Sequence, residues 1–307
     1  MSHTRQELRL SVTDPDGGTW EVAATAHLPA SDVLPSRPTV LVAVPGSGYG
    51  RRYYDIAEPG YSQAEHHTAL GTIVVAVDPL GVGDSDVPPL ETTTMATVAA
   101  TTHEVVTTIV SRLRAGALAP GYPAVSPSAV VGLGQSMGGF IVIGTQAAHR
   151  TFDAIAALGS ALSGTRLATA PDAAPVDVPP GTPPDEAAAL ILAHVDWRYN
   201  FHWEDELPAL VEADVAAGLP IRHTAPPWGS LTSPGLVNTL ITAEAIAPAA
   251  AAIDVPVLLG SGERDVVGPA AEELAALTSA TDISWVVFPR MAHMHNFAGT
   301  PADHRTK

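Results

Sequence analysis

One short motif in the sequence has the residue types and spacing of a serine nucleophile. Gly134-Gln135-Ser136-Met137-Gly138 is the only G-x-S-x-G match in the chain. It lies between an apolar run that predicts a strand and an apolar segment that predicts a helix. A serine on such a turn exposes its hydroxyl above the sheet, and the flanking glycines leave room for the turn. Ser136 is therefore a candidate nucleophile; the alternative is a glycine-rich turn that only closes a strand onto a helix.

A serine of this kind is positioned by a buried strand before it and a helix after it. The pattern of a strand followed by a helix recurs along the chain. Continuous apolar runs, typical of strands buried on both faces of a parallel sheet, lie at 40–44, 72–77, 129–133, 154–158, 255–259 and 283–288. Helical patterns lie between them at 93–118, 137–149 and 270–278. Two extended segments, 8–12 and 19–28, precede this series. The pattern predicts an α/β fold with a mostly parallel central sheet flanked by helices.

The alternation of strands and helices stops in the middle of the chain. Helical patterns without intervening strands occur at 185–196, 205–216 and 234–252, after a loop rich in proline and alanine. We therefore predict that residues 1–159 and 254–307 form the α/β core and that residues 160–253 form an inserted helical cap.

With these motifs in place, the sequence resembles the α/β-hydrolase superfamily in its esterase, lipase and thioesterase branch. The resemblance rests on the elbow Gly134-Gln135-Ser136-Met137-Gly138-Gly139 and on the D-x-x-G-x-G-x-S loop from Asp78 to Ser85. It implies the α/β-hydrolase fold and a serine nucleophile, whereas dehalogenases and epoxide hydrolases of this fold use aspartate. It also implies that the nucleophile, the acid and the histidine follow one another in this order along the chain.

The resemblance assigns the other two members of a catalytic triad. Asp265 lies a few residues past the run 255–259, where the family places its acid, with Glu263 as a competitor. His293 follows the last predicted strand. The family usually has glycine before this histidine, and the small Ala292 still lets the loop approach the serine. His295 is the alternative base.

The resemblance also implies two backbone donors for an oxyanion. Met137 N–H directly follows the nucleophile, and a second N–H is expected from the loop after the run 40–44. The family usually has His-Gly at the start of this loop, whereas this chain has Pro45-Gly46. We assign the second donor to the Ser47 N–H, with Gly48 as the rival.

Aromatic residues suggest an apolar substrate pocket. Trp197, Trp203 and Trp228 lie in the predicted cap, and Tyr49 lies in the predicted oxyanion loop. We predict that these side chains line a pocket over Ser136. The alternative is that they only pack the cap on the core.

The charge and the composition of the chain limit which kinds of partner it can bind. The formal net charge is −17, which disfavours nucleic acid and anionic membranes, and no apolar run is long enough to span a bilayer. The chain has no cysteine, and we expect neither a metal nor a cofactor, because no dense His/Asp cluster or phosphate-binding loop is present. We expect a cytoplasmic protein with a small-molecule substrate; the oligomeric state stays open, a homodimer included.

These observations favour a serine hydrolase that cleaves a carboxylic ester, lactone or thioester of an apolar substrate through an acyl-enzyme. Acyl transfer or lyase chemistry on the same fold is one alternative. A non-catalytic protein that binds a small ligand is another, because a fold alone does not decide function.

Overall fold

One central sheet organises the molecule in the computed structural model. The model describes residues 3–168, 170, 173–174, 176–179, 181–240 and 243–299. Eight strands pair in the order β1-β2-β4-β3-β5-β6-β9-β10. Their bounds are β1 Thr4–Thr13, β2 Thr19–Leu28, β3 Thr39–Val44, β4 Ile73–Val77, β5 Ala129–Gln135, β6 Ala154–Leu158, β9 Val257–Gly262 and β10 Ile283–Phe288.

The direction of pairing divides the sheet into two parts. β1 pairs with β2, and β2 with β4, in antiparallel fashion. All pairs from β4 through β10 are parallel. The carboxyl ends of the parallel strands therefore meet along one edge of the sheet, where binding sites form in such folds. This architecture confirms the predicted mostly parallel α/β fold.

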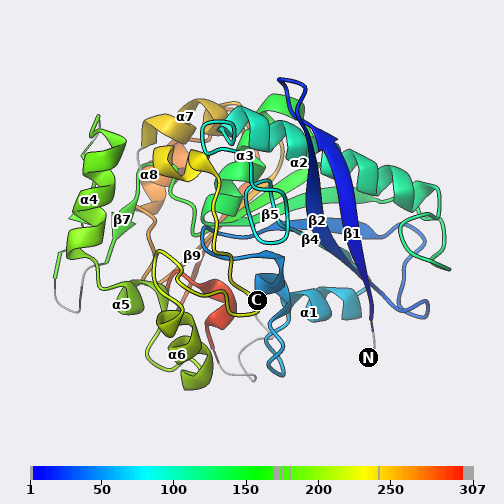
Figure 1. The fold of residues 1–307 in the computed structure, drawn as a ribbon, viewed down its shortest axis with the longest axis horizontal. Helices are drawn as coiled ribbons and strands as arrows, with labels where there is room; N and C mark the ends of the chain where they lie inside the picture. Colours follow the sequence, from blue (N-terminus) through cyan, green and yellow to red (C-terminus); the bar gives the residue numbers. More distant parts are fainter. Residues whose placement is uncertain are drawn as a thin grey trace.

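Helices cover both faces of the sheet. Helices α2 (Met95–Arg114) and α3 (Met137–His149) pack together on one face, and α1 (Gln63–Ala69) lies on the other (Figure 1). The strands β3 and β4 are almost entirely buried because apolar side chains on both of their faces meet these layers. The remaining core elements are the 3-10 helix η1 (Arg51–Asp55), α8 (Ala270–Ala275) and η3 (His295–Phe297). No helix in the described part of the chain combines the length and the apolar character needed to cross a bilayer.

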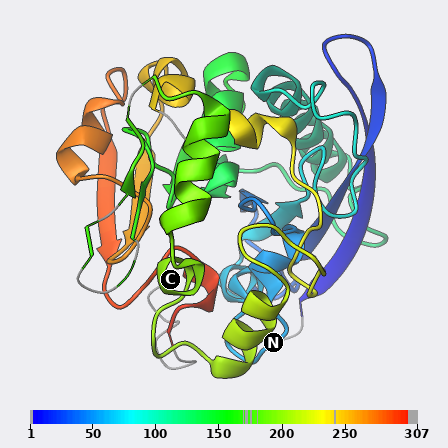
Figure 2. The same ribbon diagram turned by 60° about the vertical axis from the view of Figure 1, so that its left-hand side comes forward.

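The segment between β6 and β9 consists of short helices, two short strands and the loops between them. Its elements are β7 (Arg166–Leu167), β8 (Val176–Asp177), α4 (Pro184–His194), α5 (Trp197–Phe201), α6 (Pro208–Ala216), the 3-10 helix η2 (Gly235–Thr239) and α7 (Ala243–Ala251). The view in Figure 2 brings α4 forward, in light green.

One helix of the predicted cap packs with the core. Helix α7 contacts α3, and its Ile246 and Ala250 are buried in the main apolar cluster. Helices α4, α5 and α6 instead lie toward the carboxyl edge of the sheet. The division at residues 159/160 and 253/254 stays a prediction.

Candidate active site

Ser136 lies on a strained turn at the carboxyl end of β5. Its backbone has φ 53° and ψ −120°, a conformation that L-residues rarely adopt, and α3 begins at the next residue. Two glycines make the turn sterically feasible. A Cβ on Gly138 would lie 1.9 Å from the carbonyl oxygen of Val44, and one on Gly134 would lie 2.2 Å from the Gly138 backbone. The turn therefore holds the Ser136 side chain between the end of a central strand and the start of a helix.

Asp265 follows β9 and is surrounded by hydrogen-bond donors. Its Oδ1 lies 2.7 Å from Nδ1 of His293, and its Oδ2 lies 2.7 Å from Nε2 of His295. The backbone N–H groups of Gly262 and Val266 also donate to it, at 2.7 and 2.8 Å. Burial alone would raise the pKa of this carboxyl, but the two imidazoles and their hydrogen bonds hold the pKa well below its usual range. Asp265 is therefore a carboxylate that orients both rings.

His293 follows β10, and its loop is held by the predicted cap. The His293 N–H donates to the carbonyl of Asn200 at 3.2 Å, and the ring packs on Phe201 at 5.2 Å between centroids. Gly159, with φ +58°, leaves room for the ring, because a Cβ there would lie 3.1 Å from His293 Nδ1. The amide of Gln135 donates to the His293 carbonyl at 3.0 Å. Contacts from α5, from the end of β5 and from the loop after β6 thus position this imidazole.

Ser136 and His293 line the same cavity, although no hydrogen bond joins the Ser136 hydroxyl to the imidazole. The nitrogen of His293 that does not face Asp265, Nε2, lies 3.4 Å from Nε2 of Gln135. Hydrogen bonds between a nucleophile and its base are often long without substrate and tighten when the substrate binds.

His295 lies on the opposite side of Asp265 and does not line the cavity. It is buried, and its Nδ1 has no hydrogen-bond partner. The structure therefore places only one of the two candidate histidines beside Ser136.

The loop after β3 brings Ser47 to the same cavity as Met137. The Ser47 hydroxyl lies 2.8 Å from that of Ser233, which also accepts the Gly48 N–H at 3.3 Å. The Gly48 N–H is thus engaged elsewhere. No acceptor within the described chain is found for the N–H groups of Ser47 and Met137.

The cavity above these groups has a volume of about 300 Å³ and an apolar wall. Apolar side chains that line it include Phe140, Leu167, Ile191, Trp197, Phe201 and Val266. Thr165 and Asn238 are polar members of the wall, and none of the lining residues in the described part of the chain is Asp, Glu, Lys or Arg. The cavity therefore suits an uncharged, largely apolar ligand.

Of the aromatic residues predicted for the pocket, only Trp197 lines it. Trp203 packs against the guanidinium of Arg264, at 4.5 Å. Tyr49 and Trp228 point into a separate buried cluster, in which both donate to Asp214, at 2.6 and 2.7 Å. Their polar tips need a buried acceptor, which explains why they turn away from the cavity.

This Asp214 cluster is a fully buried ionic network beneath the predicted oxyanion loop. Arg222 donates to Asp214 Oδ1 at 2.8 Å, and His202 Nε2 lies 3.0 Å from Oδ2. The other ring nitrogen of His202 lies 2.7 Å from Glu206. Burial opposes protonation of this imidazole, but the two carboxylates raise its pKa to about 9. His202 is thus a cation at neutral pH, with both nitrogens occupied.

Arg222 links the Asp214 cluster to the loop after β3, the predicted oxyanion loop. Its Nε donates to the Gly48 carbonyl at 3.0 Å, and its guanidinium lies 4.5 Å from the centre of the Tyr49 ring. Because the planar guanidinium is bonded both to Asp214 and to the Gly48 carbonyl, it fixes the position of this loop. Asp214 and Arg222 were missed in the sequence analysis, because neither residue belongs to a recognisable motif. An acidic residue within a helix such as α6 usually lies on a solvent-exposed face. His295 was recognisable from the sequence as the alternative base, because it lies two residues after His293 in the same loop.

Known proteins resemble this chain in sequence family and in fold. A family model described as "Alpha/beta hydrolase family" matches residues 41–303. No curated protein matches the chain. The fold is similar to that of a thermophilic esterase from Thermogutta terrifontis, with a TM-score of 0.59, 17% identity, and coverage of 94% of this chain and 92% of that one.

Two further solved structures extend the comparison. An esterase from Exiguobacterium antarcticum has a TM-score of 0.59 and 16% identity, over 93% of this chain and 92% of that one. A bromoperoxidase from Bacillus anthracis has a TM-score of 0.58 and 15% identity, over 94% of each chain. At such identities the likeness describes the fold.

Proposed function

Because the chain belongs to the alpha/beta hydrolase family, we propose that it is a serine hydrolase that cleaves an uncharged carboxylic ester, lactone or thioester through an acyl-enzyme. The observation that supports this most directly is the meeting of three groups. Ser136 on its strained turn shares a cavity with His293, and the far nitrogen of His293 is held 2.7 Å from Asp265. This is the arrangement that activates a serine in unrelated hydrolases.

The proposed reaction begins with attack of the Ser136 hydroxyl on the substrate carbonyl. Nε2 of His293 takes the hydroxyl proton and returns it to the leaving alcohol, lactone oxygen or thiol. Water then attacks the acyl-enzyme, with the same imidazole as the base. Asp265 fixes the tautomer with Nδ1 protonated and stabilises the imidazolium, which a permanently ionised carboxylate can do.

Negative charge on the tetrahedral intermediate needs donors in place before the reaction. We assign these to the N–H groups of Met137 and Ser47, which belong to residues of the cavity wall and have no acceptor among the described residues. Each such donor typically contributes about 3 kcal/mol in the transition state. The Asp214 cluster supports this assignment, because Arg222 holds the carbonyl of the residue after Ser47.

The cavity wall supports a choice among substrates. A charged substrate group would lose its hydration there without an ionic partner, which is costly. An alkyl or aryl group would instead contact Leu167, Ile191 and Trp197. The substrate class we favour is therefore an uncharged ester with an apolar acyl or alcohol group.

Hydrolysis of p-nitrophenyl esters tests this proposal. We expect turnover of p-nitrophenyl butyrate and hexanoate, and loss of p-nitrophenol release in Ser136→Ala. The matched charged ester, p-nitrophenyl hemisuccinate, should have a kcat/KM more than about tenfold lower, because its carboxylate must be desolvated. Equal turnover by wild type and Ser136→Ala would contradict the proposed nucleophile, and preference for the hemisuccinate would contradict the substrate class.

A further inference from the structure

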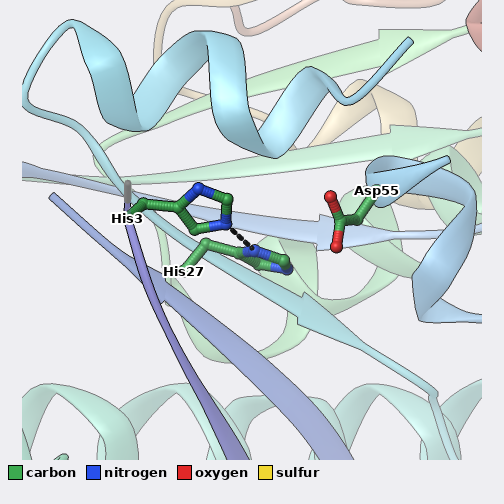
Figure 3. A group of neighbouring side chains, drawn as sticks. All are labelled: His3, His27 and Asp55. Carbon is green, nitrogen blue, oxygen red and sulfur yellow. Dashed lines mark hydrogen bonds between the residues drawn. The ribbon is translucent and has the colours of Figure 1, made fainter. Parts of the chain in front are cut away.

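Three side chains of metal-binding type meet outside the proposed active site, at the start of the sheet. His3 precedes β1, His27 lies near the end of β2, and Asp55 ends η1. Figure 3 shows the two imidazoles adjacent to each other, with the Asp55 carboxylate facing them. His3 and His27 lie outside residues 41–303, so the family match does not account for them.

The distances within this cluster suit a small cation. Nε2 of His3 and Nδ1 of His27 share a hydrogen bond at 3.1 Å, which a bound ion would replace. One ligand atom from each of the three residues lies within 4.8 Å of the others. Two nitrogens bound to one tetrahedral Zn²⁺ at about 2.0–2.1 Å lie about 3.3 Å apart. We propose that His3, His27 and Asp55 form a binding site for a divalent transition-metal ion of the Zn²⁺ type. The sequence analysis predicted no metal, because these residues are far apart in the chain and form no motif.

The buried member of the cluster provides a ligand ready for a metal. His27 is 1% exposed. Burial among packed side chains holds this ring in place, so binding of an ion costs little side-chain freedom. The nearby carboxylate of Asp55 supplies the negative charge that favours a divalent cation.

Asp55 has two other partners, which compete with the ion. The Ser62 hydroxyl donates to its Oδ1 at 2.6 Å, and Arg5 forms an ion pair with its Oδ2 at 2.6 Å. The Ser62 bond orients the carboxylate and leaves lone pairs for a metal. The Arg5 side chain is 55% exposed, so it can move into water when a cation binds. Arg5 is therefore expected to weaken the site rather than to build it.

A route for the ion lies beside the cluster. His27 and Asp55 line a cavity of about 460 Å³. Its other charged side chains are Glu7, Glu58, Arg5, Arg51 and Arg52, so the cavity is polar but not uniformly acidic. This cavity does not include Ser136 or His293. It provides water for the coordination position that the three side chains leave open. An ion bound there would tie the start of β1 to β2 and to η1, and would stabilise the edge of the sheet.

Titration of metal-free full-length protein with ZnCl₂, followed by calorimetry and thermal unfolding, tests the proposal. We expect one high-affinity Zn²⁺ per chain and a rise in the unfolding midpoint of about 5 °C at saturation. His3→Gln and His27→Gln should each lower affinity more than about tenfold. Co²⁺ should give visible absorption bands typical of low coordination number, which both variants lose.

Two matched variants keep this test independent of folding. Arg5→Gln removes the competing cation and should increase Zn²⁺ affinity, an effect that misfolding does not produce. His149→Gln alters another histidine pair, His103 and His149, whose rings stack at 4.9 Å, and should leave binding unchanged. Absence of tight Zn²⁺ binding in wild type, or unchanged affinity in His3→Gln and His27→Gln, would overturn the proposed site. The test does not depend on the proposed hydrolase activity.

Discussion

Two buried aspartates of this protein hold imidazoles in opposite ways. Asp265 holds His293 by one nitrogen, and His293 also lines the cavity beside Ser136. Asp214 holds His202 by one nitrogen, but Glu206 takes the other, and His202 does not line the cavity. A base needs a lone pair that faces substrate, whereas a doubly occupied imidazolium only carries charge. The comparison teaches that an Asp–His pair is a candidate for catalysis when its second nitrogen belongs to a cavity-lining ring with no carboxylate on it, and that burial alone does not distinguish the two pairs.

The largest expected difference between the two assemblies is in catalysis. In a comparison of His293→Gln with the matched variant His202→Gln, we expect His293→Gln to lower kcat/KM for p-nitrophenyl butyrate by at least about 10⁴-fold, because serine loses its base. His202→Gln should lower it less than about tenfold at 25 °C and reduce the thermal midpoint instead. Similar losses of kcat/KM in the two variants would break the distinction.

The next expected effect concerns the link between the Asp214 cluster and the oxyanion loop. Asp214→Asn weakens the anchor of Arg222, which holds the Gly48 carbonyl. Displacement of one oxyanion donor should lower kcat by about 100-fold with little change in KM, because the donor acts mainly in the transition state. Steady-state kinetics measures this split, with circular dichroism as the check on folding. A change confined to KM would contradict the positioning role.

A third effect is a pH dependence of stability. The pKa of His202 is raised to about 9 in the folded protein, above the ordinary value near 6.5. The stabilisation is therefore fully present below pH about 6.5 and is lost as the pH rises toward 9, by about 3 kcal/mol in total. Urea unfolding of wild type between pH 6.5 and 9.5 should show this decline, and His202→Gln should lack most of it. Parallel curves for the two proteins would exclude His202 as the source.

The smallest expected effect is that of Ser47→Ala. We propose that this residue acts through its backbone N–H, whereas its hydroxyl lies 2.8 Å from that of Ser233. The variant should therefore lower kcat less than about threefold, far below the roughly 100-fold loss of a whole oxyanion donor. A Ser47→Pro variant, which removes the N–H, is the contrasting measurement. Equal kcat values for the two variants would argue against the assigned donor.

The regular part of the fold was predictable because its signals are local. The apolar runs gave β6 and β10 with the observed bounds, and α3 begins and ends where its apolar pattern predicts. The loop positions of Ser136, Asp265 and His293 follow from parallel strands that end at one edge.

The Asp214 cluster was not predictable, because its contacts join distant parts of the chain. Tyr49 and Asp214 are 165 positions apart, and nothing near either residue indicates the other. From the sequence, Tyr49 and Trp228 were predicted to line the pocket, and Asp214 carried no prediction. In the structure these polar groups are buried together instead, because each one meets the hydrogen-bonding requirement of another. The side chains that line a pocket are therefore harder to predict than the position of Ser136 at the end of a strand.

The most direct test of the central claim is intact-mass spectrometry after reaction with a fluorophosphonate. Such a probe reacts with a serine that an adjacent base has activated. We predict a single phosphonyl adduct on wild type and on His202→Gln, little or none on His293→Gln, and none on Ser136→Ala. An adduct that persists in Ser136→Ala, or absence of any adduct on wild type, would contradict the assignment of Ser136 and His293 as the nucleophile and its base.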